Sequence, residues 1–133
     1  MGSWLRYHCP RCRFAVAIGG PEEFYFDAGG ERRSYGHPDP VSEEARARGV
    51  DGFWMTLWCN RCVAAKRLIT MEFTAPCDPL DAWCGRAEPR SGFPAEAEHC
   101  LDCGTALLDE LPGVPTLCPS CHQSGVETGK VFD

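Results

Sequence analysis

The sequence lacks any long run of apolar residues. No stretch approaches the roughly 20 apolar residues that a membrane-spanning helix needs. Residues 1–8 carry no apolar run of secretory length before Cys9, and Arg6 stands where N-myristoylation requires Ser or Thr. We therefore expect a soluble protein of the reducing cytoplasm, with no membrane association.

An excess of positive charge is also missing. The 13 Lys and Arg residues face 19 Asp and Glu residues, so the formal net charge is -6. Residues 1–75 carry ten basic and nine acidic residues, whereas residues 76–133 carry three and ten. Two four-thiolate zinc sites, each of charge -2, bring the loaded protein to about -10. This balance disfavours general binding of nucleic acid, because phosphate contacts depend on positive charge.

The usual signatures of catalysis are not found. No persuasive Ser-His-Asp order is present, and no Gly-rich loop could cradle a phosphate. We therefore favour a non-enzymatic protein.

Cysteine, in contrast, is abundant, with ten residues in 133. Eight of them form four Cys-x-x-Cys pairs: Cys9/Cys12, Cys59/Cys62, Cys100/Cys103 and Cys118/Cys121. This spacing lets two thiolates reach one tetrahedral ion at about 2.3 Å, and the amides of the intervening turn can donate to the sulfurs. Four copies favour metal ligation over a redox site or disulfides. The sequence thus predicts two zinc ions, each held by four cysteines, with iron in one site as the alternative.

The gaps between the pairs suggest which of them share an ion. Fourteen residues separate Cys103 from Cys118, close to the four-cysteine zinc template of roughly 15 to 20, while 46 residues separate Cys12 from Cys59. We expect sequential pairing, first pair with second and third with fourth. The interleaved pairing, first with third and second with fourth, is the alternative. The expected domains are an N-terminal module over 1–75 with a long insertion, a linker or packed loop over 76–99, and a C-terminal module over 100–133.

Hydrophobic periodicity predicts a β-rich fold. We expect strands over residues 4–8, 14–18, 23–27, 31–35, 52–59, 65–73 and 130–132, with the run Gly19-Gly20-Pro21 ending the second of them. One short helix is expected after the cap Ser42, ending at Gly49. A two-stranded ribbon over 52–73 cannot cover both of its own faces. One face must therefore meet the insertion, the second module or a partner. The predicted fold class is a small metal-stabilised β-rich protein of two zinc-ribbon-like modules, with one short helix in the N-terminal module.

The cysteine pairs resemble those of the zinc-ribbon and rubredoxin-like superfamily. The likeness is carried by residues 7–12 (YHCPRC) and 117–122 (LCPSCH), and it covers about a third of the chain. It implies four-cysteine metal sites and leaves substrate and partner open. In that superfamily Gly often follows the second cysteine, so that a backbone amide faces a sulfur. Here only Cys103 is followed by Gly, and Arg13, Val63 and His122 stand at the other three positions.

The two remaining cysteines, Cys77 and Cys84, have a six-residue spacer that is unusual for a metal-binding pair. We interpret them as buried thiols, with a third half-site that includes His37 or His99 as the alternative. Three histidines, His8, His99 and His122, adjoin a cysteine of a pair. Because four thiolates already complete a tetrahedron, we expect these rings to flank the sites rather than ligate.

A basic and aromatic group surrounds the two N-terminal pairs and supplies the candidate partner-binding residues: Arg11, Arg13, Arg61, Lys66, Arg67, Trp54 and Trp58. The cations could simply balance a site of charge -2, and the tryptophans could pack within the sheet. A sharper hypothesis is a nucleic-acid patch with stacking tryptophans. We expect a zinc-binding adaptor or accessory protein that presents a ribbon surface to another protein. The alternatives are a rubredoxin-like electron carrier and a nucleic-acid-binding zinc ribbon.

Overall fold

The computed structural model describes residues 2–90, 99–112 and 117–132. Part of the expected linker, residues 91–98, lies outside the described residues. The described chain forms six strands and two short helices: β1 Ser3–His8, β2 Ala15–Phe26, β3 Arg32–Ser34, α1 Glu43–Arg48, β4 Val50–Cys59, β5 Ala64–Cys77, α2 Pro79–Trp83 and β6 Glu127–Phe132. The expected small β-rich fold is confirmed, with one helix more than expected.

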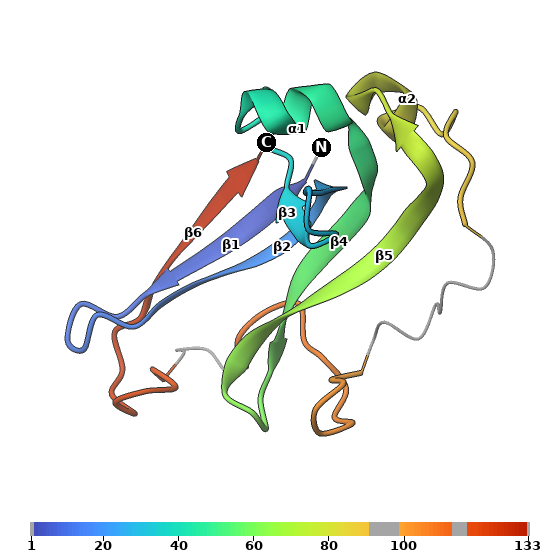
Figure 1. Cartoon of the computed structure of the whole chain (residues 1–133). Coiled ribbons are helices and arrows are strands. Elements are labelled where there is room, and N and C mark those ends of the chain that lie inside the picture. Colours follow the sequence, from blue (N-terminus) through green and yellow to red (C-terminus); the bar gives the residue numbers. More distant parts are fainter. Residues whose placement is uncertain (1, 91–98, 113–116, 133) are drawn as a thin grey trace.

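All six strands join one antiparallel sheet in the order β5-β4-β2-β1-β6, and the short β3 pairs with β2. The last strand, β6, pairs with the first, β1, so the sheet brings the C-terminal and N-terminal segments of the chain side by side (Figure 1). Both helices lie at one end of the sheet, and the tips of the β1–β2 and β4–β5 hairpins lie at the other (Figure 1).

Strand β2 is longer than expected, because Gly19, Gly20 and Pro21 do not end it. Its pairing with β4 shifts register between Gly19 and Glu22, which is a β-bulge. A Cβ on Gly19, at φ 146°, would lie 2.1 Å from the carbonyl oxygen of Ser3 in β1. The glycine therefore permits close approach of β1, and the strand bends without stopping.

Helix α1 begins and ends as expected. The Ser42 hydroxyl accepts a hydrogen bond from the Ala45 amide at 3.1 Å, and Gly49 ends the helix at φ 80°. Helix α2 was not predicted, although Asp78 caps it by accepting from the Leu80 amide at 2.9 Å and Pro79 opens it. At five residues, α2 is too short to show an apolar period. Neither helix has the length and apolar character needed to cross a bilayer.

Two apolar clusters fill the two ends of the sheet. At the helix end, the buried members are Tyr25, Tyr35, Ala45, Val50, Phe53, Phe73 and Ala82. At the hairpin-tip end, they are Tyr7, Ile18, Trp58 and Leu111. In the second cluster the Tyr7 hydroxyl accepts a buried hydrogen bond from the Leu111 amide at 3.1 Å. Trp58 and Leu108 exchange backbone hydrogen bonds of 2.8 Å. The β4–β5 ribbon therefore packs against α1 and α2 through Phe53 and Phe73, and against the segment that follows Cys103 through Trp58.

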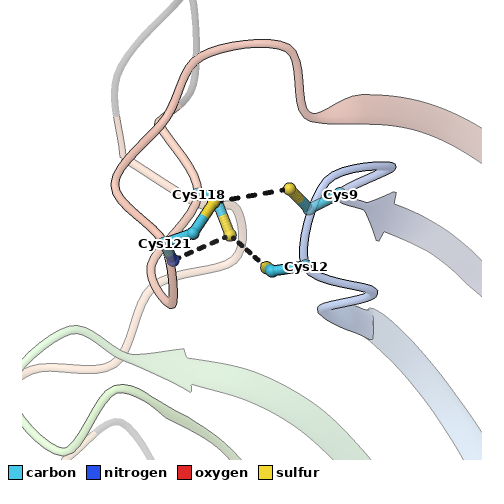
Figure 2. Close-up of side chains that lie close together, drawn as sticks. All are labelled: Cys9, Cys12, Cys118 and Cys121. Atoms are coloured by element: carbon cyan, nitrogen blue, oxygen red, sulfur yellow. Dashed lines mark hydrogen bonds between the residues drawn. The ribbon is translucent and has the colours of Figure 1, made fainter.

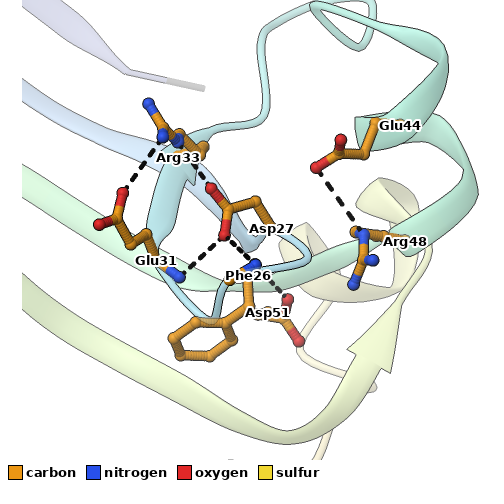
Figure 3. A network of polar contacts seen from close by, with 8 residues as sticks. Phe26, Asp27, Glu31, Arg33, Glu44, Arg48 and Asp51 are labelled. Atoms are coloured by element: carbon orange, nitrogen blue, oxygen red, sulfur yellow. Dashed lines mark hydrogen bonds and ion pairs between the residues drawn. The ribbon is translucent and has the colours of Figure 1, made fainter.

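A polar network fixes the turn from β2 to β3 (Figure 3). The Asp27 carboxylate accepts hydrogen bonds from the amides of Gly29 and Glu31, at 2.8 and 3.0 Å, and from the Arg33 side chain at 2.9 Å. These bonds, led by that of Arg33, lower the pKa of Asp27. Asp51 of β4 lies beside the turn, where its carboxylate accepts from the Phe26 amide at 2.7 Å.

Candidate metal centres

Each Cys-x-x-Cys pair forms a tight turn, which we call a knuckle: residues 9–13, 59–63, 100–104 and 118–122. In three knuckles the first cysteine's amide donates to the carbonyl five residues on, at 2.8 Å for Cys9, 2.8 Å for Cys100 and 2.9 Å for Cys118. In the fourth, Cys59 pairs with Ala64 where β4 turns into β5. All four knuckles are thus hairpin-like tips with the same local plan.

The residue after the second cysteine is left-handed in every knuckle. Its φ is 64° at Arg13, 54° at Val63, 76° at Gly104 and 62° at His122. Only one of these positions holds glycine, so the knuckle turn imposes this conformation whatever the residue type. For the β-branched Val63 the strain is on the order of 1–3 kcal/mol.

The eight cysteines gather into two groups of four. The first group is Cys9, Cys12, Cys118 and Cys121, and the second is Cys59, Cys62, Cys100 and Cys103. In the first, the Cys9 and Cys121 sulfurs lie 3.7 Å apart and the Cys12 and Cys118 sulfurs 3.5 Å apart. Figure 2 shows the four side chains pointing toward one another from two loops. The second group has sulfur separations of 3.5 Å, between Cys59 and Cys103, and 3.9 Å, between Cys62 and Cys100.

This grouping corrects the pairing expected from the gaps. The knuckles are nested: the first shares a group with the fourth, and the second with the third. Sequential pairing is wrong, and so is the interleaved alternative. Neither group lies within one of the expected modules, because each joins the 1–75 segment to the 100–133 segment. The module boundaries themselves stay a prediction.

Antiparallel pairing explains the nesting. His8 at the end of β1 faces Glu127 at the start of β6, so the knuckle after β1 meets the knuckle before β6. In the same way Trp58 faces Leu108, and the knuckle that begins at Cys59 meets the one that ends before Leu108. In both places long-range strand contacts, rather than the number of intervening residues, choose the partner.

The sulfur positions fit a tetrahedral metal ion. Ligands at about 2.3 Å from a tetrahedral zinc ion lie about 3.8 Å from one another. The sulfur–sulfur separations between facing knuckles, 3.5 to 3.9 Å, fall around that value. A set of four thiolates suits zinc or iron, and it leaves no open position for a substrate. These residues could hold the ions, whose chemistry here would be structural cross-linking.

Backbone amides face the sulfurs and change their acidity. The Cys62 amide lies 3.3 Å from the Cys59 sulfur, and the amides of Ser120 and Cys121 lie 3.4 and 3.5 Å from the Cys118 sulfur. Burial alone would raise the pKa of Cys118, but these amides bring it down to about 7. Hydrogen bonds from Thr105 lower the pKa of Cys103 to about 6. Each group therefore contains a thiol that readily becomes the first thiolate ligand.

The first cysteine of every knuckle, Cys9, Cys59, Cys100 and Cys118, is buried. The second cysteines are partly or fully exposed, with Cys62 the most open. Each group is thus buried on one side and reaches the surface on the other.

The remaining cysteines and the histidines lie outside both groups. Cys77 is half-buried against the helix-end cluster, and burial raises its pKa, as expected for a packed thiol. Cys84 is exposed, so its interpretation as a buried thiol was wrong. Of the histidines beside knuckles, His8 is exposed and lies 3.8 Å from Glu127, while His99 and His122 are exposed.

The candidate partner-binding residues divide into two kinds. Arg11, Arg13 and Arg61 are exposed on the knuckles and form no ion pair with another described residue. Lys66 instead binds Asp102 of the facing knuckle at 2.5 Å. Arg67 lies 3.6 Å from Glu22 and covers the ring of Trp54 at 4.2 Å.

Both tryptophans of the candidate set are buried. Trp54 is 5% exposed, and Trp58, 1% exposed, packs edge-on against Phe14 at 6.0 Å. The alternation of side chains along β4 predicts which face of the strand these rings lie on. It does not predict whether other residues cover that face. The exposed side chains of Val63, Leu101 and Leu117, which sequence analysis passed over, lie on or beside knuckles.

Comparisons with models of protein families, with curated proteins and with solved structures found no match to this chain. The zinc-ribbon likeness therefore rests on the two four-cysteine groups alone.

Proposed function

We propose that this protein is a zinc-binding, non-enzymatic adaptor that presents the knuckle end of its sheet to a protein partner. The observation that carries this proposal is the position of its exposed apolar side chains. Six large hydrophobic residues are exposed in the described chain, and three of them, Val63, Leu101 and Leu117, lie on or next to a knuckle. Leu101 is 91% exposed at a knuckle tip, so its side chain packs little against the described residues.

A groove between the two metal groups adds to this surface. It has a volume of about 250 Å³, and its lining residues come from two knuckles and the segment between them: Asn60, Val63, Leu111, Pro112, Leu117, Cys118, Pro119 and His122. The two knuckles that line the groove belong to different four-cysteine groups, so the shape of the groove depends on both metal sites being formed. Arg61 lies on one of the two knuckles that line the groove, and Arg11 and Arg13 lie on knuckle 9–13, which shares a metal group with the other. These exposed cations favour a partner segment that combines acidic and apolar side chains.

Zinc supports this role by fixing loops. A closed four-thiolate site offers no position for a substrate, so its contribution is to hold two knuckles together. The nucleic-acid alternative needs exposed rings on which bases can stack, whereas Trp54 and Trp58 are buried. The electron-carrier alternative requires iron in place of zinc in one of the four-cysteine sites.

Metal analysis of the purified protein distinguishes zinc from iron. We expect about two zinc ions per chain and a colourless protein. A red oxidised protein that contains iron would instead support the electron carrier.

Partner capture from the native host tests the surface. The test variant is Val63→Ser combined with Leu101→Ser, and the matched control is Val41→Ser combined with Leu80→Ser, two equally exposed residues near the helices, both at 62%. We expect one or more proteins to be enriched by the wild type and by the control but lost with the test variant. Equal enrichment by all three chains, or enrichment of nucleic acid in place of protein, contradicts the proposal.

A further inference from the structure

The side chain of Glu23 is a buried carboxylate that is only half satisfied. Glu23 is 1% exposed, in the middle of β2. Its Oε1 atom accepts a hydrogen bond from the Trp83 indole and lies 3.1 Å from Nδ1 of His37. Its Oε2 atom has no hydrogen-bond partner among the described residues. Buried polar atoms are nearly always paired, so this oxygen lacks a donor that something else must supply.

Three separate parts of the fold build this arrangement. Glu23 follows the bulge in β2, His37 comes from the loop after β3, and Trp83 ends helix α2. The Trp83 ring also packs on Phe53 of β4, with centroids 4.6 Å apart. Because elements distant in sequence converge on one oxygen, the geometry is a product of the tertiary structure and not of a local turn.

A small cavity adjoins the carboxylate. Its volume is about 110 Å³, and it is lined by Gly2, Pro21, Glu22, Glu23, Gly36, His37 and Trp83. That is room for more than one water-sized group, beside two carboxylates. Of the two carboxylates, that of Glu22 already pairs with Arg67 at 3.6 Å. Glu23 forms no ion pair with Lys or Arg of the described chain, and its single charged-pair contact is with His37. The cavity therefore favours a small group that is cationic and donates hydrogen bonds.

An apolar groove of about 430 Å³ shares two walls, Pro21 and Trp83, with this cavity. Its other walls include the rings of Phe53 and Phe73 and the side chain of Met71, which is 41% exposed. A groove lined by apolar and aromatic side chains beside a few polar groups is the usual form of a small-ligand site.

We propose that the cavity binds a primary ammonium group, with the Glu23 carboxylate as acceptor, and that the apolar body attached to it lies along Trp83 into the groove. The ammonium supplies the N–H donor that Oε2 lacks and neutralises a buried charge. Two sources share this chemistry: a free alkylamine or arylalkylamine, and the lysine side chain of another protein.

Titrations of the wild-type full-length protein test the proposal without any mutation. Each of the four tryptophans contributes one indole N–H signal to a ¹H–¹⁵N spectrum, and the signal of Trp83 reports on the cavity. The probes are n-butylammonium, neutral 1-butanol, and tetramethylammonium, which is charged but has no N–H donor. We expect n-butylammonium to shift the Trp83 signal and to bind about tenfold or more tightly than either other probe, because a charge-assisted hydrogen bond is lost in both. Equal responses to all three probes, or none from Trp83, overturn the proposal.

A substitution then tests the acceptor. Glu23→Gln keeps the size of the side chain and removes its charge, and Glu31→Gln is the control at an exposed carboxylate that pairs with Arg33. We expect Glu23→Gln to weaken n-butylammonium binding about tenfold, whereas Glu31→Gln leaves it unchanged. Equal affinities in the two folded variants would contradict the assignment, and if Glu23→Gln does not fold, the probe comparison on the wild type decides alone.

A lysine derivative blocked at both its α-amine and its carboxyl group separates the two sources. Binding comparable to that of n-butylammonium points to a lysine of another protein, and much weaker binding points to a free amine. Either result leaves the adaptor proposal untouched, because the knuckle variants test a different end of the molecule.

Discussion

Two acidic residues of one polar network, Asp51 and Asp27, have opposite shifts in pKa (Figure 3). Burial raises the pKa of Asp51, and the charge of Glu72 adds to the rise, while the Phe26 amide opposes it. Hydrogen bonding to Arg33 lowers the pKa of Asp27. The sequence identifies both residues as acidic, but only their surroundings decide which one favours the proton.

The raised pKa of Asp51 predicts a stability cost at neutral pH. The folded state binds the proton more tightly than the unfolded state, so the stability due to Asp51 falls as pH rises from its ordinary pKa through the raised one. Asp51→Asn retains an acceptor for the Phe26 amide and removes the charge. We expect its free energy of unfolding, relative to wild type, to increase as pH rises from about 4 to about 7. Denaturant unfolding at matched pH and zinc concentration measures this difference.

Asp27→Asn serves as the control of opposite sign. Its lowered pKa means that the charged form stabilises the fold above the ordinary pKa, and that this contribution is lost as pH falls through the folded one. The variant should therefore be less stable than wild type near neutral pH and match it more closely in acid. If both variants show the same trend with pH, the assigned causes are wrong.

At the scale of elements, hydrophobic alternation and turn residues predict most of the strands. Where the predicted strands and helices are wrong, the reason is local. Gly19, Gly20 and Pro21 were expected to end a strand, but a bulge lets β2 continue because β1 and β4 pair with it on both sides. Helix α1 was predicted from its cap and its terminal glycine, whereas α2 was missed although it has Asp78 and Pro79 at its start. A helix of five residues carries a capping signal but is too short to show the hydrophobic period that would support it.

The nested grouping of knuckles gives a sharp prediction about metal content. A variant with Cys9, Cys12, Cys118 and Cys121 all changed to Ser loses one complete group and keeps the other. We expect this variant to retain about one zinc ion per chain, measured by native mass spectrometry.

The matched variant changes Cys59, Cys62, Cys9 and Cys12 to Ser. It also removes four thiolates, but it takes two from each group, so we expect no tightly bound zinc. Sequential pairing predicts the reverse pattern, one ion in the second variant and none in the first. The two measurements together therefore decide the pairing.

On the scale of the whole molecule, the two ends of the sheet are held differently. The helix end packs the larger apolar cluster under α1 and α2, while the knuckle end has a smaller one and both four-cysteine groups. Structural zinc in small domains contributes about 10–16 kcal/mol of apparent binding energy near pH 7. The knuckle end should depend on metal far more than the helix end does.

Metal removal tests this division. After chelation at neutral pH we expect amide hydrogen exchange at Tyr7 and Trp58 to accelerate at least about tenfold more than at Val50 and Phe53. Acid should act in the same direction, because protons compete with metal for the thiolates and the stabilisation is lost as pH falls. Readdition of zinc at neutral pH is the control and should restore protection. Uniform acceleration along the sheet would show instead that the two ends unfold as one unit.

The sequence by itself determined the local chemistry: eight cysteines in four knuckles, a β-rich chain and the helix that follows Ser42. These features depend on neighbours within a few residues, where turn geometry, capping and alternation act. The tertiary structure alone decided which knuckles share a metal, which tryptophans are buried and where Glu23 lacks a donor. Each of these depends on contacts between segments far apart in the chain, above all β1 with β6 and Trp58 with Leu108. Residue spacing carries no information about such contacts, because the strands that make them can be separated by any length of chain.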